Sequence, residues 1–80
     1  MNDNDIHRHI EELVAEEHRL LDRAEGSALS AEQTDRLKQV EVQLDRYFDL
    51  LRQRRAREEF GQNPESSKMR SAETVERYLQ

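Results

Sequence analysis

The most distinctive chemistry in this sequence is a group of four arginines directly after its densest apolar patch, which covers residues 44–51. A guanidinium group grips a carboxylate or a phosphate through two parallel hydrogen bonds, so this cluster could hold an anion or an acidic patch on another protein. Arginines near the end of a helix also complement the helix dipole, and they could pair with an acidic helix start. Both interpretations remain open. The four are Arg52, Arg54, Arg55 and Arg57.

Three histidines offer a second kind of chemistry, metal binding. His7 stands four residues before Glu11, and His18 stands four residues before Asp22. The two side chains of each pair lie on one helix face and could bind one metal ion together. No glutamate precedes any histidine by three residues, so the Glu-x-x-His pattern of di-iron bundles is missing. His7, His9 and His18 all fall at the edge of an apolar stripe, where histidines are usually solvated. Metal binding is therefore an alternative interpretation, and we expect no cofactor.

The absence of cysteine limits both the chemistry that the chain can perform and the ways in which it can be stabilised. It removes thiol catalysis, disulfides and zinc–thiolate sites. The serines fall in turn or cap contexts with no histidine near them in sequence, so we expect a protein that is not an enzyme. Eighty residues, of which 39% are charged, form one small domain that is marginal alone. Long helices and self-association are the remaining sources of stability.

The net charge of −5 is unevenly distributed. Residues 1–50 carry 13 acidic and 6 basic side chains, whereas residues 51–60 carry 4 arginines and 2 glutamates. Nucleic-acid binding needs an extended basic surface, which this chain lacks. We therefore expect at most a weak association with nucleic acid, through residues 52–57. No segment is apolar enough to span a membrane, and no hydrophobic signal follows Met1. We expect a cytoplasmic protein.

Apolar spacing predicts two long helices. The first covers about residues 4–25 and the second about residues 31–60, and both carry apolar stripes at helical spacing. Gly26 is expected to end the first helix in a left-handed conformation, and Ser30 with Gln33 forms a capping box for the second. So short a connection makes the helices antiparallel neighbours. Ile6 should then lie near Leu51, with Asp3 and Asp5 near the arginines.

The hairpin leaves part of both stripes uncovered, so we predict a homodimer that closes a four-helix bundle. Glu17 lies within the first stripe, where a carboxylate is costly unless it is paired, and the sequence leaves its burial open. The dimer orientation is open as well. The predicted hairpin or dimer core consists of Ile6, Ile10, Leu13, Val14, Leu21, Leu37, Val40, Leu44, Tyr47, Phe48 and Leu51.

The sequence changes character after residue 60. Gly61 and Asn63-Pro64 end the second helix, and residues 61–71 read as a polar, mobile linker. Ser71 caps a short helix at about residues 72–79, within a final unit of residues 72–80. A helix this short is unstable alone, so it either docks on the bundle or becomes ordered on binding a partner. Its predicted partner-binding residues are Val75, Tyr78 and Leu79.

Several runs resemble a small actinobacterial family of unknown function. They are residues 1–6, residues 11–20, the run Leu44-Asp45 with residues 49–56, and residues 75–80. The resemblance implies a tryptophan where this chain has Phe48, and a free-standing small bacterial protein, but no activity or cofactor. The sequence therefore predicts an all-α interaction or structural module, which dimerises through its hairpin and presents the arginines and the last helix to a partner with an acidic or anionic patch.

Overall fold

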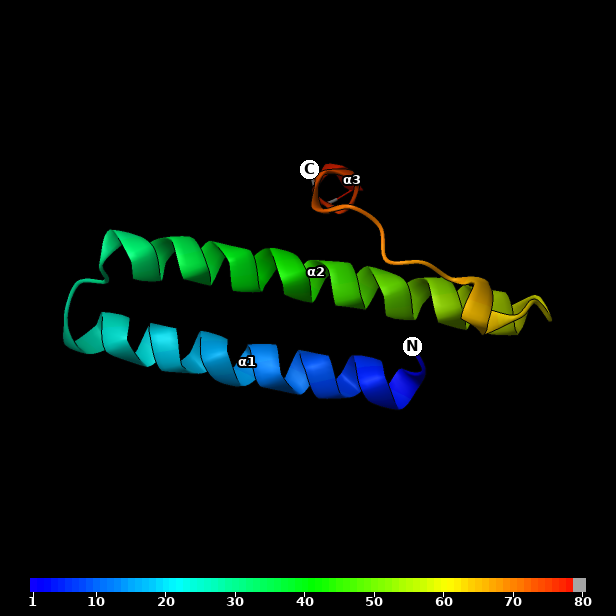
Figure 1. The fold of residues 1–80 in the computed structure, drawn as a ribbon, viewed down its shortest axis with the longest axis horizontal. Helices are drawn as coiled ribbons and strands as arrows, with labels where there is room; N and C mark the ends of the chain where they lie inside the picture. The colour runs from blue at the N-terminus through cyan, green and yellow to red at the C-terminus, as the bar shows by residue number, and fades with distance from the viewer. Residues whose placement is uncertain (79–80) are drawn as a thin grey trace.

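Two long antiparallel helices form the body of the molecule. The computed structural model describes residues 1–78, of which residue 78 is described by its backbone only. Helix α1 spans Asp3–Gly26, α2 spans Ala31–Glu59, the 3-10 helix η1 spans Pro64–Ser66, and α3 spans Ala72–Tyr78. The molecule is elongated, with extents of 50 × 26 × 15 Å. Figure 1 shows α1 and α2 side by side, with α3 on the side of α2 that faces away from α1. The predicted all-helical hairpin with a short last helix is confirmed.

Side-chain caps fix where the helices begin. The Asp5 amide donates to the Asn2 side chain over 2.8 Å, and the Gln33 amide donates to the Ser30 hydroxyl over 3.1 Å. Each N3 side chain accepts from the backbone amide of its cap residue in return, which completes two capping boxes. The Thr74 amide donates to the Ser71 hydroxyl at the start of α3. The predicted caps Ser30 and Ser71 are therefore confirmed.

The prediction for Gly26 is wrong. Gly26 is the last residue of α1, and Ser27 ends the helix in an extended conformation while its amide donates to the Arg23 carbonyl over 3.0 Å. Among the described residues, the glycine with a positive φ is Gly61, at 70°. Gly61 directly follows the C-cap of α2, where the left-handed conformation reverses the chain.

The apolar seam between α1 and α2 follows the predicted pairing. Ile6 is completely buried and packs in one cluster with Leu50 and Leu51, and Ile10 and Tyr47 lie against this cluster. The remaining buried apolar residues of the hairpin lie closer to the turn; they are Leu20, Val40 and Leu44. Ile6 is therefore level with Leu51, as the antiparallel register requires.

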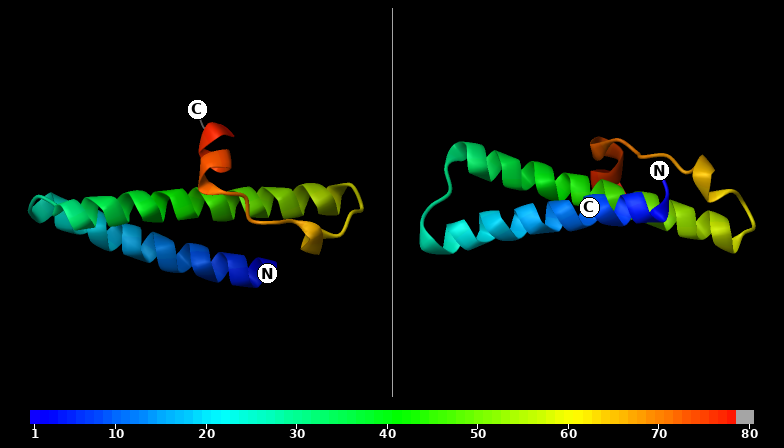
Figure 2. Two further views of the ribbon diagram at one scale, coloured as in Figure 1. Left: turned by 45° about the horizontal axis from the view of Figure 1, so that its top comes forward. Right: turned by 60° about the horizontal axis from the view of Figure 1, so that its bottom comes forward.

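Residues 61–71, predicted as a polar linker, run back along α2. We call residues 63–70 the return segment; Figures 1 and 2 show it following the C-terminal half of α2. The Gln53 side-chain amide donates to the Lys68 carbonyl over 2.8 Å and accepts from the Lys68 amide. Arg46 donates to the Arg70 carbonyl over 2.9 Å. These bonds use backbone atoms of the return segment, so its side-chain pattern gives no sign of them.

Helix α3 docks on the middle of α2. In Figure 2 it stands across α2 and does not run alongside it. Its Val75 side chain is fully buried, and Ala72 lies beside Val42 of α2. The sequence left two alternatives for the last helix, docking on the bundle or ordering on a partner. In the structure it docks, on the same chain. Phe60, the C-cap residue of α2, remains 77% exposed.

Candidate interaction surfaces

The arginine cluster divides into residues with different surroundings. Successive helical residues are rotated by about 100°, so arginines at neighbouring positions cannot share one face. Arg54 is buried, Arg57 is half-buried, and Arg52 and Arg55 are exposed. The structure therefore separates Arg54, which is buried, from the other three arginines.

Arg54 joins the start of α1 to the return segment. Its guanidinium is 7% exposed and forms ion pairs with Asp3 and, over 3.1 Å, with Glu65. It also donates to the carbonyl of Met1 over 3.0 Å and to that of Pro64 over 3.4 Å. Its hydrogen bond to Asp3 raises the pKa of Arg54 above its ordinary value, and that to Glu65 adds to this effect. Asp3 therefore pairs with an arginine of α2, as predicted, and this arginine, Arg54, is buried.

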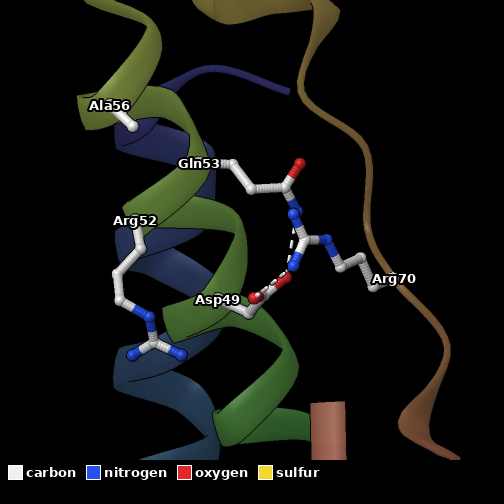
Figure 3. Close-up of a pocket in the computed structure, with 5 residues that line it drawn as sticks. All are labelled: Asp49, Arg52, Gln53, Ala56 and Arg70. Atoms are coloured by element: carbon white, nitrogen blue, oxygen red, sulfur yellow. Dashed lines mark hydrogen bonds and ion pairs between the residues drawn. The ribbon is translucent and has the colours of Figure 1, made fainter. Parts of the chain in front are cut away.

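A second internal link centres on Asp49, a residue that sequence reasoning missed. Its carboxylate is buried, and it accepts hydrogen bonds from Gln53 over 2.9 Å and from Arg70 over 3.5 Å. Figure 3 shows the Arg70 guanidinium turned toward Asp49 and Gln53, while the Arg52 side chain extends away from them. Asp49 thus gives the return segment an anchor on α2.

Beside this link lies a shallow groove between α2 and the return segment. It consists of two adjoining hollows of about 360 and 210 Å³ that share Gln53, Ala56 and Arg70. Ala56 and Phe60 supply apolar surface, and Arg52 and Arg57 lie along its edges. Within residues 1–78, neither the Arg52 nor the Arg57 guanidinium has a hydrogen-bonding or ionic partner. We call this the arginine groove, made of Arg52, Gln53, Ala56, Arg57, Phe60 and Arg70.

One side of the α1–α2 hairpin is closed by polar and aromatic contacts. The rings of His9 and Tyr47 are stacked with centroids 5.1 Å apart. Glu16 accepts two hydrogen bonds from the Arg36 guanidinium, one of them over 2.7 Å. The hydrogen bond from Arg36 lowers the pKa of Glu16 below its ordinary value. These contacts link the two helices at two levels along this side.

The opposite side of the hairpin is apolar and uncovered. Phe48 is rotated by about 100° from Tyr47 on α2, and Leu21 lies on the corresponding side of α1. Phe48 is 42% exposed and Leu21 is 44% exposed. Val14 and Leu37 share this side and are half-buried. We call these four residues the open flank. Its two exposed members belong to the predicted core, and burying them needs a surface from outside the chain.

Glu17 lies beside the open flank, three residues after Val14 and four before Leu21. Its side chain is half-buried, and the described part of the chain gives it no ion pair or hydrogen bond. Glu16, its neighbour, is the residue that pairs across the hairpin. The apolar spacing of the sequence singled out Glu17 as a carboxylate within the stripe. It gave no sign that Glu16 pairs with Arg36.

The docking site of α3 contains two carboxylates. One carboxylate oxygen of Glu76 is shielded from solvent and has no hydrogen-bond partner among the described residues. Burial raises the pKa of Glu76, and the nearby Asp45 carboxylate raises it further. The docked position of α3 therefore favours the protonated form of Glu76.

Other predicted residues are placed as follows. His7 and His18 are exposed and His9 is half-buried; no three His, Asp or Glu side chains within residues 1–78 converge as metal ligands. Val75 packs inside the chain. The side chain of Tyr78, and Leu79 as a whole, lie outside the described residues. None of the described helices is both long and apolar enough to cross a membrane.

Comparison with known proteins places these features in a family. The model of the family described as "Protein of unknown function (DUF2630)" matches residues 2–80. The chain belongs to this family. It is 39% identical over 77 residues to "Uncharacterized protein Mb0922c" of Mycobacterium bovis and to "Uncharacterized protein Rv0898c" of Mycobacterium tuberculosis. Each match covers 95% of this chain and 88% of the relative. The resemblance to a small actinobacterial family is thereby confirmed. No solved structure gives a significant match.

Proposed function

We propose that this DUF2630 member is a small, non-catalytic interaction module that forms a homodimer through the open flank. Its arginines and α3 are then presented to another protein. The observation that carries the proposal is the difference between the two sides of the hairpin. The His9–Tyr47 stack and the Glu16–Arg36 pair close one side, whereas Leu21 and Phe48 are left exposed on the other.

The register of the hairpin supports a second copy as the cover of this flank. Because Ile6 is level with Leu51, Leu21 is within one residue of the level of Leu37, and Ile10 is within one residue of the level of Phe48. A copy facing the open flank can therefore set the α1 side chains of one hairpin against those of the other hairpin's α2, apolar against apolar. Such an arrangement closes a four-helix bundle.

The partner-facing residues follow from what the chain leaves unpaired. Arg52, Arg55 and Arg57 have no partner within the described residues, so we propose them as contacts for an acidic protein surface. Arg54 is engaged with Asp3 and Glu65, which supports a stabilising role for it inside the chain. We keep the last helix, with Val75, Tyr78 and Leu79, as a second contact that becomes accessible when α3 leaves α2.

The test of the dimer is the molar mass in solution, measured by light scattering after gel filtration across a concentration series. We expect twice the chain mass of 9.6 kDa for the natural sequence. Phe48→Glu should give the monomer mass, because it places a charge in the apolar interface. Phe60→Glu is the matched control, since Phe60 is exposed in the arginine groove, and it should remain dimeric. A monomer at every concentration would contradict the proposal.

A further inference from the structure

We infer that the arginine groove binds an extended, acidic segment of a partner protein, in which two carboxylates lie beside an apolar side chain. This inference deepens the proposed function and rests on it for the existence of a partner. It concerns a different surface from the open flank, so the two ideas can fail separately.

The shape of the groove indicates an extended ligand. Asp49, Gln53, Ala56 and Phe60 follow one another along one face of α2, and the return segment forms the opposite wall. Residues 49 to 60 span about 16 Å at 1.5 Å per helical residue. An extended chain covers this length with about five residues. The Gln53 amide is already bound to Asp49 and to the Lys68 backbone, so the wall is held in place without a ligand.

The unpaired charges of the groove indicate carboxylates. Arg52 and Arg57 have no partner within residues 1–78, although the whole chain carries a net charge of −5. These two arginines are about 7.5 Å apart along the helix axis. They are also about 140° apart around the helix, so they flank the groove from opposite edges. Successive side chains of an extended chain point to opposite sides, so two acidic residues that are adjacent or three positions apart can each face one of the arginines.

The apolar part of the groove indicates the third feature of the ligand. Phe60 is 77% exposed, and it lies one turn beyond Ala56 on the same face. An apolar side chain within two positions of the acidic pair would cover Phe60 and Ala56. Arginine is one of the residue types that most often dominate the affinity of protein interfaces.

A nucleic acid fits this groove less well than a peptide does. Phosphate-backbone binding takes several cationic side chains along an extended surface. The groove offers Arg52 and Arg57 without partners, while Arg70 is already paired with Asp49. The acidic first half of the chain would repel a long polyanion. A short segment with two carboxylates matches the charge that is present.

The experiment is a selection from a randomised seven-residue peptide library displayed on phage, with the full-length protein as bait. We expect enrichment of peptides with two acidic residues that are adjacent or three positions apart and an apolar residue close by. The binding of the enriched peptides, made synthetically, is then measured by fluorescence anisotropy. The double variant R52Q/R57Q should weaken their binding by about tenfold or more, since each substitution removes a charge-assisted contact.

Two controls decide whether the groove is responsible. Arg23→Gln removes an exposed arginine in the last turn of α1, away from the groove, and it should leave peptide affinity within about twofold. A duplex DNA oligonucleotide serves as the polyanion probe. The inference is overturned if the enriched peptides lack acidic residues, if R23Q weakens binding as much as R52Q/R57Q does, or if DNA competes as well as the peptides do.

The solution mass separates this inference from the dimer. R52Q/R57Q should keep the mass of the natural protein, because the open flank is unchanged. Leu21→Glu, which charges the open flank from α1 and far from Arg52, should give a monomer that keeps its peptide affinity, because the arginine groove lies within one chain. A monomeric natural protein that still selects acidic peptides would contradict the dimer alone. A dimer that selects none would contradict the groove alone.

Discussion

Arg54 shows how far the surroundings of one residue can differ from those of its neighbours in sequence. It stands among exposed arginines, yet its guanidinium binds Asp3 of α1 and Glu65 of the return segment. A charge this well shielded from water is tolerated because its donors are satisfied. Arg54 therefore connects the start of α1, α2 and the return segment by polar contacts, in addition to the apolar cluster in which Ile6, Leu51 and Met69 meet.

Replacing Arg54 with alanine should lower the free energy of unfolding by about 2 kcal/mol, because hydrogen bonds to two charged groups and two carbonyls are lost. Urea unfolding followed by circular dichroism measures this change. Arg55→Ala is the matched control, since Arg55 is exposed and unpaired, and it should change stability by less than about 0.5 kcal/mol. Equal effects of the two substitutions would show that Arg54 has no special stabilising role.

The sequence could locate the arginines but not assign their roles. Helical spacing predicts that residues 52, 54, 55 and 57 point in different directions, and the acidic residues 3 and 5 lie at the expected end of α1. Which arginine turns inward depends on where residues 63–65 return, and these residues carry no periodic signal. The same reasoning applies to Asp49, whose burial depends on the position of Arg70.

At the scale of elements, what could be predicted follows from local rules. Capping boxes and apolar spacing placed α1 and α2 to within about one residue, because both signals lie within a few positions of each helix end. The path of the return segment escaped prediction because Gln53 and Arg46 hold it by backbone atoms, which every residue possesses. The crossed docking of α3 depends on this path.

The docking of α3 should strengthen on acidification. Burial and Asp45 raise the pKa of Glu76 in the docked state, so the undocked state binds the proton less tightly. The penalty of docking an ionised Glu76 is therefore present above the raised pKa and disappears as the pH falls through it. We expect the hydrogen-exchange protection factor of the Val75 amide to rise between about pH 7.5 and about pH 4.5.

Glu76→Gln provides the control for this pH dependence. The substitution keeps the size of the side chain and removes its charge, so protection at Val75 should be high and nearly independent of pH. The measurement must be local, because acid also weakens the Glu16–Arg36 pair, in which the pKa of Glu16 is lowered. If protection of the Val75 amide falls on acidification in the natural protein, Glu76 is not the group that controls the docking of α3.

At the scale of the whole molecule, the decisive feature is that a 50 Å hairpin is closed on one side only. The long axis gives the open flank room to pack against a second hairpin over several helical turns. α3 lies on the side of α2 away from α1, and the arginine groove adjoins the return segment, so both can remain accessible in a dimer formed through the open flank. Self-association and partner binding are thereby assigned to separate surfaces.

Glu17 tests whether dimerisation uses the open flank. Dimerisation through the open flank would bury its unpaired carboxylate in both copies, which opposes association. Glu17→Leu should therefore tighten the dimer by about tenfold or more, measured as the dissociation constant in sedimentation equilibrium. Glu12→Leu adds the same apolar side chain to the closed side of the hairpin, beside His9 and Tyr47, and should leave the constant unchanged. If both substitutions tighten association equally, added hydrophobicity alone explains it; if only Glu17→Leu does, the interface is the open flank.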